Sequence, residues 1–316
     1  MNADDVKKIA VIGAGLIGQA AVAEFALGGY PVMLNSRSEE SIQRGLNGVR
    51  AMLDRMMGLG LTSEGKAVDA MNRVAAEPDL KTCVEEVQLV YEAVYEDLEL
   101  KQGIFREMDE CCPAETIFVS GTSSLSLKDL ASATGRPDKM LLANYTNPPY
   151  LVPLAEVMRN EDTSDETVSV FCEVLTNIGK KPVVIEKEVP GFVGNRLQLA
   201  LLREALHLVQ TGVVTAEGVD TIIKSSIGRR WAVAGVFEVF DLAGQDLTLA
   251  AYSYLAPHLD RSVEPPQVLR DKVGRGELGV KTGKGFYDWT PESADALRRR
   301  IANALVEIEK WSRTLS

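Results

Sequence analysis

The spacing of apolar residues changes once along the chain, and this change divides the predicted structure into two parts. Before about residue 188, short apolar runs alternate with stretches of helical character. Such alternation is typical of a parallel sheet with helices on both faces. A pair of amphipathic helices is predicted over 39–72, with a break at 58–60. The segments predicted as strands are 9–12, 31–34, 87–94, 116–119, 140–143 and 182–186.

The second part begins after Pro190-Gly191. From Phe192 to Val209 the apolar residues recur at helical spacing, and little of the sequence that follows resembles a strand. A chain of 316 residues is also too long for one simple core. We therefore predict an α/β domain over residues 1–188 and an all-helical domain over residues 189–316.

A glycine-rich turn, GAGLIG at 13–18, directly follows the first predicted strand and opens the first predicted helix. In such a turn the first glycine permits the tight bend, the second lets the backbone approach a pyrophosphate, and the third allows close packing of helix on strand. The free N–H groups at the helix start bind phosphate. A purely structural turn is the alternative, but the position between strand and helix favours a Rossmann-type site for a nicotinamide dinucleotide. The predicted cofactor-binding residues here are Gly13, Gly15, Leu16, Ile17 and Gly18.

The end of the second predicted strand indicates which nicotinamide is used. NAD sites usually place Asp or Glu there to bind the ribose 2′-hydroxyl. This chain instead reads Asn35-Ser36-Arg37-Ser38. Arg37 could grip a 2′-phosphate through charge-assisted hydrogen bonds, each of roughly 1.5–3 kcal/mol. Ser36 and Arg37 therefore favour NADP(H), and the alternative is an exposed arginine in a protein that accepts NAD.

Composition and charge exclude several other classes of protein. The formal net charge of −11 would repel nucleic acid phosphates. No apolar run approaches the ~20 residues that cross a bilayer, and the first residues lack the pattern of a signal peptide. The four cysteines have no metal-ligand spacing. We expect a cytoplasmic enzyme that acts on a small molecule and binds no metal, nucleic acid or membrane.

Several short motifs follow one another in an order that resembles the 3-hydroxyacyl-CoA dehydrogenase superfamily. Any one of them is weak, but the ordered set is specific and spans nearly the whole chain. The run at 147–157, NPPYLVPLAEV, looks more like the branch that contains carnitine dehydrogenase and lambda-crystallin. The motifs are YEAVYEDL at 91–98, SGTSSL at 120–125, TNPP at 146–149, LAEV at 154–157, PGFVGNRL at 190–197 and KTGKGFY at 281–287.

The resemblance implies positions for the cofactor, the substrate and a partner. Glu96 and Lys101 would lie beside the cofactor, and Lys281 near its nicotinamide end. Ser123 would face the substrate oxygen, and Asn195 would hydrogen-bond the reacting site across the interdomain cleft. The C-terminal helices of the family form a dimer interface, so a homodimer is expected.

One position departs from the family in a way that affects the chemistry. The family has a histidine just after the strand at 140–143, oriented by a later glutamate. Here the histidine position holds Asn144, while Glu156 stands at the glutamate position. Asparagine cannot transfer a proton at neutral pH, and general acid–base catalysis contributes ~10²–10⁴-fold, or roughly 3–5 kcal/mol. The two histidines of the chain, His207 and His258, are distant from this motif in sequence.

Different or relocated proton chemistry is the interpretation we favour for this substitution. NADPH is usually the reducing form, so the Ser36-Arg37 pair indicates reduction. A protonated imine already carries its proton, so its reduction needs positioning more than a strong acid. Asn144 would then hold the substrate with the help of Ser123, and Glu156 would stabilise the cation or, if sufficiently buried, donate a proton.

Three further residues are candidates for the substrate. Tyr145 is an alternative proton donor if its phenol points into the cleft, Arg230 could bind a carboxylate, and Trp231 could form an apolar wall. The helix pair at 39–72 shows no clear basic cluster for the phosphates of coenzyme A. A free small substrate is therefore expected rather than a CoA thioester.

The sequence as a whole predicts an NADPH-dependent oxidoreductase that transfers hydride to a C=N or C=O bond of a small substrate. Two alternatives stay open. One is an NAD(P)-dependent 3-hydroxyacid or 3-hydroxyacyl-CoA dehydrogenase that tolerates Asn144. The other is a cofactor-binding relative without catalytic activity.

Overall fold

The computed structural model describes residues 1–315, which fall into unit 1 (Met1–Gly194) and unit 2, beginning at Asn195. The predicted boundary lies at 188. The structural division falls later because the linker after the last strand packs onto unit 1. Glu188 accepts hydrogen bonds from two backbone N–H groups of unit 1, and Phe192 is fully buried.

Unit 1 is built on one eight-stranded sheet with the order β3-β2-β1-β4-β5-β6-β7-β8. Neighbouring strands are parallel except for β6 and β7, which are antiparallel. The predicted doubly wound sheet of Rossmann type is confirmed, with one antiparallel step added to it. The strands are β1 (Ile9–Ile12), β2 (Val32–Asn35), β3 (Val74–Ala76), β4 (Leu89–Glu92), β5 (Ile117–Ser120), β6 (Met140–Tyr145), β7 (Leu154–Met158) and β8 (Lys181–Ile185).

Two of these strands were not predicted as strands. β3 is only three residues long and half-buried at the sheet edge, so its apolar signal is short. β7 is buried almost throughout, but Glu156 stands in its middle and breaks the apolar run by which a buried strand is recognised. The antiparallel step therefore had no sequence signal of its own.

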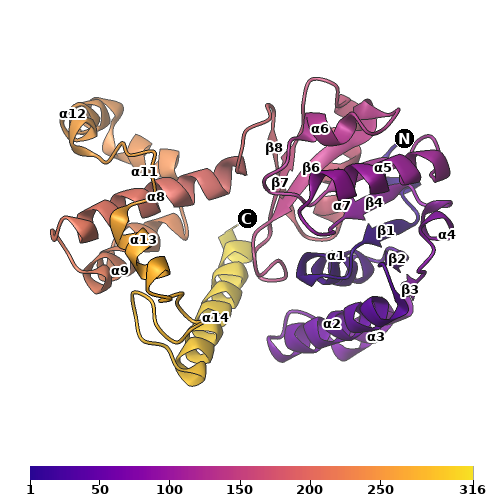
Figure 1. Ribbon diagram of the computed structural model, residues 1–316, viewed down its shortest axis with the longest axis horizontal. Coiled ribbons are helices and arrows are strands. Elements are labelled where there is room, and N and C mark those ends of the chain that lie inside the picture. The colour runs from indigo at the N-terminus through magenta and orange to yellow at the C-terminus, as the bar shows by residue number, and fades with distance from the viewer. Residues whose placement is uncertain (316) are drawn as a thin grey trace. The chain divides into compact units, whose positions relative to one another are not determined.

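Helices cover both faces of the sheet (Figure 1). Residues of α1, α2, α3 and α7 join the core on one face, and residues of α4, α5 and α6 join the core on the other. The predicted pair of helices over 39–72 is observed as α2, which begins after a capping box at Ser38, and α3. The helices of unit 1 are α1 (Leu16–Leu27), α2 (Glu39–Gly58), α3 (Glu64–Asn72), α4 (Leu80–Val84), α5 (Leu98–Cys111), α6 (Leu127–Ala131) and α7 (Asp165–Asn177), with short 3₁₀ turns at Ala3–Asp5 and Pro137–Lys139.

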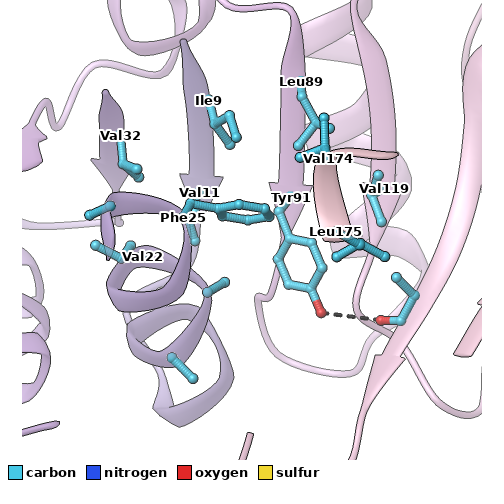
Figure 2. Packing of buried hydrophobic residues seen from close by; sticks show 14 of the residues in the cluster. Ile9, Val11, Val22, Phe25, Val32, Leu89, Tyr91, Val119, Val174 and Leu175 are labelled. Carbon is cyan, nitrogen blue, oxygen red and sulfur yellow. Dashed lines mark hydrogen bonds between the residues drawn. The ribbon is translucent and has the colours of Figure 1, made fainter. Parts of the chain in front are cut away.

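The core on the α1 face is centred on Tyr91 of β4 (Figure 2). Its ring meets Phe25 of α1 edge-on at 6.3 Å between centroids, and its hydroxyl donates a 3.1 Å hydrogen bond to the carbonyl oxygen of Ala143. Side chains alternate between faces along a strand, so the neighbouring Glu92 projects to the opposite face. The same alternation places Asn144 and Glu156 on the face of Glu92, whereas their neighbours Ala143 and Ala155 point to the face of Tyr91.

Unit 2 is helical, and its described residues form only isolated bridges, between Gly279 and Lys284 and between Lys284 and Asp288. Its first helix, α8, begins in unit 1 at Phe192, as the periodicity predicts. The helices are α8 (Phe192–Gln210), α9 (Ala216–Ser225), α10 (Ile227–Trp231), α11 (Val236–Ala243), α12 (Gln245–Leu255), α13 (Gln267–Gly274) and α14 (Pro291–Leu315), with a 3₁₀ turn at Ala256–His258.

Two features are absent from residues 1–315, a membrane-spanning helix and a metal-binding cluster. No helix in this range combines the length and apolar composition that a bilayer span requires. The same range holds no group of three or more His, Cys, Asp or Glu side chains arranged to bind a metal ion.

Candidate active site

The glycine turn between β1 and α1 has the geometry of a dinucleotide site. Gly13 has φ +116°, and a Cβ there would lie 2.4 Å from the carbonyl oxygen of Ala93. A Cβ on Gly18 would lie 1.9 Å from the carbonyl oxygen of Gly13. Gly15, in contrast, faces open space, and no side chain caps the start of α1. The turn is therefore closed on the protein side and open, with free N–H groups, on the side a pyrophosphate would approach.

The end of β2 presents polar side chains but no carboxylate of its own. Asn35 is buried, and its side-chain Nδ2 donates hydrogen bonds to the carbonyl oxygens of Glu77 and Pro78 at 2.8 and 3.0 Å. Its amide is therefore turned into the protein. Ser36 Oγ accepts from Ser41 Oγ at 2.8 Å. Arg37 is exposed and makes no ion pair with any residue in the range 1–315. Its guanidinium is therefore available to an anionic ligand.

Acidic side chains also lie near this end of β2. Glu39 and Glu40 occupy the first turn of α2, directly after Arg37 in sequence. Glu40 is paired with Arg44 one turn further along. Only part of this negative charge is neutralised, and the remainder would oppose a 2′-phosphate.

Lys101 does not face the cofactor edge as predicted. It is 1% exposed, and its ammonium donates to Glu92 Oε1 at 2.6 Å and to the carbonyl oxygen of Val94 at 3.3 Å, with Glu96 Oε2 at 3.5 Å. These three neighbours match the three N–H donors of the ammonium group. We therefore correct the prediction: Lys101 anchors the loop after β4 rather than binding the cofactor directly.

Glu96 links the loop after β4 to the loop after β5, which carries Ser123. It accepts hydrogen bonds from the hydroxyls of Thr122 and Ser124 and from the Ser124 backbone N–H. Burial raises the pKa of the Glu96 carboxyl, but the hydrogen bonds from Ser124 and Thr122 and the charge of Lys101 outweigh burial, so the net pKa is lowered. Glu96 is thus held as a carboxylate, and its partners Thr122 and Ser124 flank the exposed Ser123 in sequence.

Asn144 and Glu156 face each other as a cross-strand pair of β6 and β7. Asn144 Nδ2 lies 3.3 Å from Glu156 Oε2. The other oxygen, Oε1, accepts from the backbone N–H groups of Val193 and Gly194, at 2.8 and 2.9 Å, in the first turn of α8. Glu156 is 3% exposed. Each of its oxygens is therefore an acceptor in a buried network.

This network changes the role predicted for Glu156. Its oxygens receive three N–H groups, so its contacts are those of a fixed carboxylate rather than a proton donor. A carboxylate can only accept, so it orients the Asn144 amide with Nδ2 inward and Oδ1 free. We therefore assign Glu156 to positioning Asn144 and the start of α8.

Tyr145 belongs to the core and not to the substrate site. It is 5% exposed, its ring stacks on Tyr91 at 5.4 Å, and the ammonium of Lys180 lies 5.0 Å from its ring centroid. Burial raises the pKa of the Tyr145 phenol well above its usual range, with Tyr91 and Glu24 adding to the effect. The prediction that Tyr145 could donate a proton is corrected on these grounds, since strand alternation turns it away from the face of Asn144.

The remaining predicted residues lie in unit 2 and are described only within it. Asn195 is in the first turn of α8, and Arg230 and Trp231 end α10, with Trp231 41% exposed. Lys281 is exposed in the turn closed by the bridge between residues 279 and 284. Hydrogen bonds from Arg275 and Lys272 lower the pKa of Glu277, which braces this turn, to about 2. Substrate or cofactor contacts of these four predicted residues stay predictions.

Two buried ion-pair residues were not singled out in the sequence. Glu24 of α1 and Lys180 are each 6% exposed and meet at 2.6 Å. Lys180 also donates to the carbonyl oxygens of Pro149 and Val152, at 2.7 and 3.3 Å, in the connection from β6 to β7. A lone glutamate within the alanine-rich run of α1 was the available signal.

Comparison with known proteins places this geometry in context. The family profile described as 3-hydroxyacyl-CoA dehydrogenase, NAD binding domain, matches residues 8–189, and the profile of the C-terminal domain matches residues 191–289.

Relatives of known name match along most of the chain. The 5-formyl-3-hydroxy-2-methylpyridine 4-carboxylate 5-dehydrogenase of Mesorhizobium japonicum is 32% identical, over 96% of this chain and 98% of its own. A crystal structure of an enzyme of that name, described as an NAD⁺-dependent dismutase, superposes with a TM-score of 0.87 at 32% identity, over 96% of this chain and 98% of that one. The L-carnitine dehydrogenase of Streptomyces coelicolor is 33% identical, over 97% and 93% of the two chains.

Proposed function

Because the chain belongs to the 3-hydroxyacyl-CoA dehydrogenase family, and because an asparagine amide stands where this resemblance implies a histidine, we propose that it is an NADPH-dependent reductase of a small protonated imine. The observation that carries the proposal is the orientation of Asn144. Its Nδ2 is turned to Glu156, so its Oδ1 is the atom offered to a substrate.

A hydrogen-bond acceptor at this position can bind an iminium group, whose N–H⁺ is a donor. A carbonyl substrate would need a donor instead, because its oxygen only accepts. The substrate N–H⁺ would donate to Asn144 Oδ1, and Glu156 behind it would add a favourable negative charge. A nicotinamide cofactor held by the glycine turn at 13–18 would supply a hydride for the iminium carbon. The C=N electron pair would then move to nitrogen, so that a neutral amine would form without an added proton. Reduction of a ketone would instead need a proton for the alkoxide, and Glu156 is occupied as an acceptor.

The loop after β5 would supply the second polar contact. Ser123 is exposed in the middle of this loop, and Glu96 holds the neighbouring Thr122 and Ser124 in place. The Ser123 hydroxyl can donate or accept, so it can orient a substrate heteroatom without transferring a proton. We assign Ser123 and Asn144 to substrate binding, and Glu96 to positioning.

The preference for NADPH is supported by the end of β2. It presents Ser36 and the unpaired Arg37 in place of an acidic residue. Arg37→Ala should raise KM for NADPH by roughly 10- to 150-fold, the equivalent of one charge-assisted contact of ~1.5–3 kcal/mol. KM for NADH should change little. An equal effect on both cofactors would refute the contact and leave NAD, which the family profile names, as the cofactor.

A substrate panel tests the function itself. Purified protein would be assayed with NADPH and NADH against cyclic imines, matching ketones, 3-hydroxy acids and pyridine aldehydes. Turnover of imines alone supports the proposal. Oxidation of 3-hydroxy acids or aldehydes with NAD⁺ would overturn it in favour of the second candidate, a dehydrogenase. That candidate is supported by the full-length similarity to the pyridine aldehyde enzyme and to L-carnitine dehydrogenase. Tight NADPH binding with no turnover would indicate a cofactor-binding protein.

Unit 2 supports a second proposal, a homodimer. Of its described apolar side chains, only Leu206, Ala294 and Val306 are buried. Large apolar residues of α8, α11 and α12 are left exposed, which is unusual for a monomer surface. A second copy of the chain is the partner we propose. Sedimentation should give twice the chain mass, and a monomer at micromolar concentration would overturn the proposal. Examples of these residues are Leu197, Leu199, Phe237, Leu242, Leu249 and Tyr252, each at least 65% exposed.

A further inference from the structure

A small cavity lies beside Ser123, entirely within unit 1. Its volume is about 80 Å³, which holds roughly two to three groups of the size of a water molecule or a methylene. It is lined by the loop at 123–126, by Leu142 of β6 and Met158 of β7, and by the linker at 188–192, and it is open on one side.

The register of β6 and β7 places the cavity next to the candidate active site. Asn144 pairs with Glu156, and Leu142 pairs with Met158 two residues away on each strand. Residues two apart in a strand point to the same face, so Leu142 and Met158 form the adjacent rung, roughly 7 Å from the polar pair. Both line the cavity. The cavity is therefore one rung from the amide that would hold the substrate.

The lining has the character of a pocket for a small apolar group. Leu142 and Met158 form an apolar wall, and Val189 and Phe192 add apolar surface from the linker. The polar part of the lining comes from Ser123, Ser124 and Ser126 of the loop at 123–126 and from Glu188 of the linker. Such a combination of apolar lining and a few polar groups is typical of substrate pockets.

The walls are fixed from several directions. Glu188 accepts from the backbone N–H groups of Leu127 and Lys128 at 3.1 and 3.4 Å, which ties the linker to the start of α6, directly after the loop at 123–126. Phe192 is buried and has φ +54°, a strained conformation for a residue with a side chain. The residues that follow Phe192 are held by Glu156, which accepts hydrogen bonds from the backbone N–H groups of Val193 and Gly194. A pocket held in this way discriminates by size because it cannot easily widen.

We propose that this cavity is a specificity subsite that receives a short apolar substituent of the substrate, of at most about three carbons. The substituent would be attached close to the atom that Asn144 and Ser123 bind. The proposal rests on the proposed function only in assuming that the substrate binds at these two residues.

Binding to the cavity can be measured without turnover. We would label the methionine methyl groups with ¹³C and titrate the protein with straight-chain alcohols from ethanol to 1-pentanol. The Met158 resonance, assigned with Met158→Leu, should shift, while that of Met108, which is buried but does not line the cavity, should not. Affinity should rise about fourfold per methylene, the equivalent of ~0.8 kcal/mol, and stop rising beyond 1-propanol. Equal shifts at both methionines, or affinity that still rises at 1-pentanol, would overturn the subsite.

A filled cavity provides the second readout. Val189→Phe should abolish the Met158 response to alcohols. It should also lower the ratio of kcat/KM for a propyl-substituted imine to that for the unsubstituted imine by about tenfold or more. Val183→Phe is the matched control, because Val183 is 52% exposed on β8 and does not line the cavity. The control should keep the wild-type ratio.

The two proposals fail in different ways. If alcohols bind at Met158 but no imine is reduced, the subsite stands and the proposed function fails. If imines are reduced with no dependence on the substituent in either variant, the proposed function stands and the subsite is refuted.

Discussion

Replacing Glu156 by glutamine should reverse the hydrogen-bonding character of the candidate active site. In the wild-type chain the carboxylate receives Val193 N–H and Gly194 N–H on Oε1 and Asn144 Nδ2 on Oε2. A glutamine can keep the two backbone hydrogen bonds on its single oxygen, but its Nε2 then faces Asn144. Two amide nitrogens cannot hydrogen-bond each other, so Asn144 should rotate and turn Oδ1 toward residue 156. Nδ2 would then face the substrate.

The magnitude follows from the bond that is lost. A hydrogen bond from an iminium N–H⁺ to Asn144 Oδ1 is charge-assisted and contributes roughly 1.5–3 kcal/mol. Its loss should lower kcat/KM for an imine by roughly 10- to 150-fold. A ketone would gain a neutral hydrogen bond of about 0.5–1.5 kcal/mol from Nδ2, or roughly 2- to 13-fold. The removed charge at the start of α8 should cost only about 0.3–1 kcal/mol of stability.

The assay is the ratio of kcat/KM for a cyclic imine to that for the matching ketone, measured for four proteins. These are the wild type, Glu156→Gln, Asn144→Ala and the double variant. Because most of the effect acts through the amide, Glu156→Gln should change the ratio more when Asn144 is present than in the Asn144→Ala background, where only the loss of the Glu156 charge remains. A general loss of structure would lower both substrates together. The reasoning is refuted if Glu156→Gln leaves the wild-type ratio unchanged. It is also refuted if the double variant differs from Asn144→Ala by as much as Glu156→Gln differs from the wild type.

Two further predictions concern the missing base and the buried ion pair. Asn144→His should create measurable alcohol oxidation, since Glu156 already stands in position to orient the ring; no activity on any 3-hydroxy acid would show that the base was not the obstacle. Lys180→Met should lower the free energy of unfolding by about 3–5 kcal/mol by leaving Glu24 buried without its partner, whereas Glu24→Gln/Lys180→Met should recover most of it. Burial raises the pKa of Glu24 above 4.5 despite the attraction of Lys180, so the folded state holds this proton more tightly than the unfolded state. That share of stability is present below pH 4.5 and is lost as pH rises through the raised pKa, a loss absent from the double variant; urea unfolding at several pH values measures it.

The sequence predicted those parts of the fold that depend on local pattern. The β1–turn–α1 unit, the helix pair α2–α3 and the long helix α8 all have a periodicity or glycine spacing that acts within one segment. β7 was missed because its central Glu156 is stabilised by partners from β6 and α8, which are distant in sequence. The antiparallel step could not be predicted for the same reason.

The candidate site shows the same division. Gly13, Gly15 and Gly18 lie as the motif requires, because the motif itself encodes the turn. The side chains of Lys101 and Tyr145 were placed wrongly, since burial and strand alternation decide where they point. Neither property is readable from a motif match. Proximity to a functional motif in sequence therefore predicted the neighbourhood of a residue but not the face on which it lies.

The hydrogen bonds of Glu156 to α8 do not depend on which residue stands at position 144. Glu156 has two partners besides residue 144, the N–H groups of Val193 and Gly194, and these tie β7 to the start of α8. Gly194 suits this close approach, because a Cβ there would lie 3.2 Å from Glu156 Oε2, a tight contact. Glu156 thus has a structural contact that does not depend on residue 144, and under the proposed function its charge acts on the substrate through the Asn144 amide. The chemistry at this position can change from proton transfer to orientation of a donor group while the packing of β6, β7 and α8 stays the same.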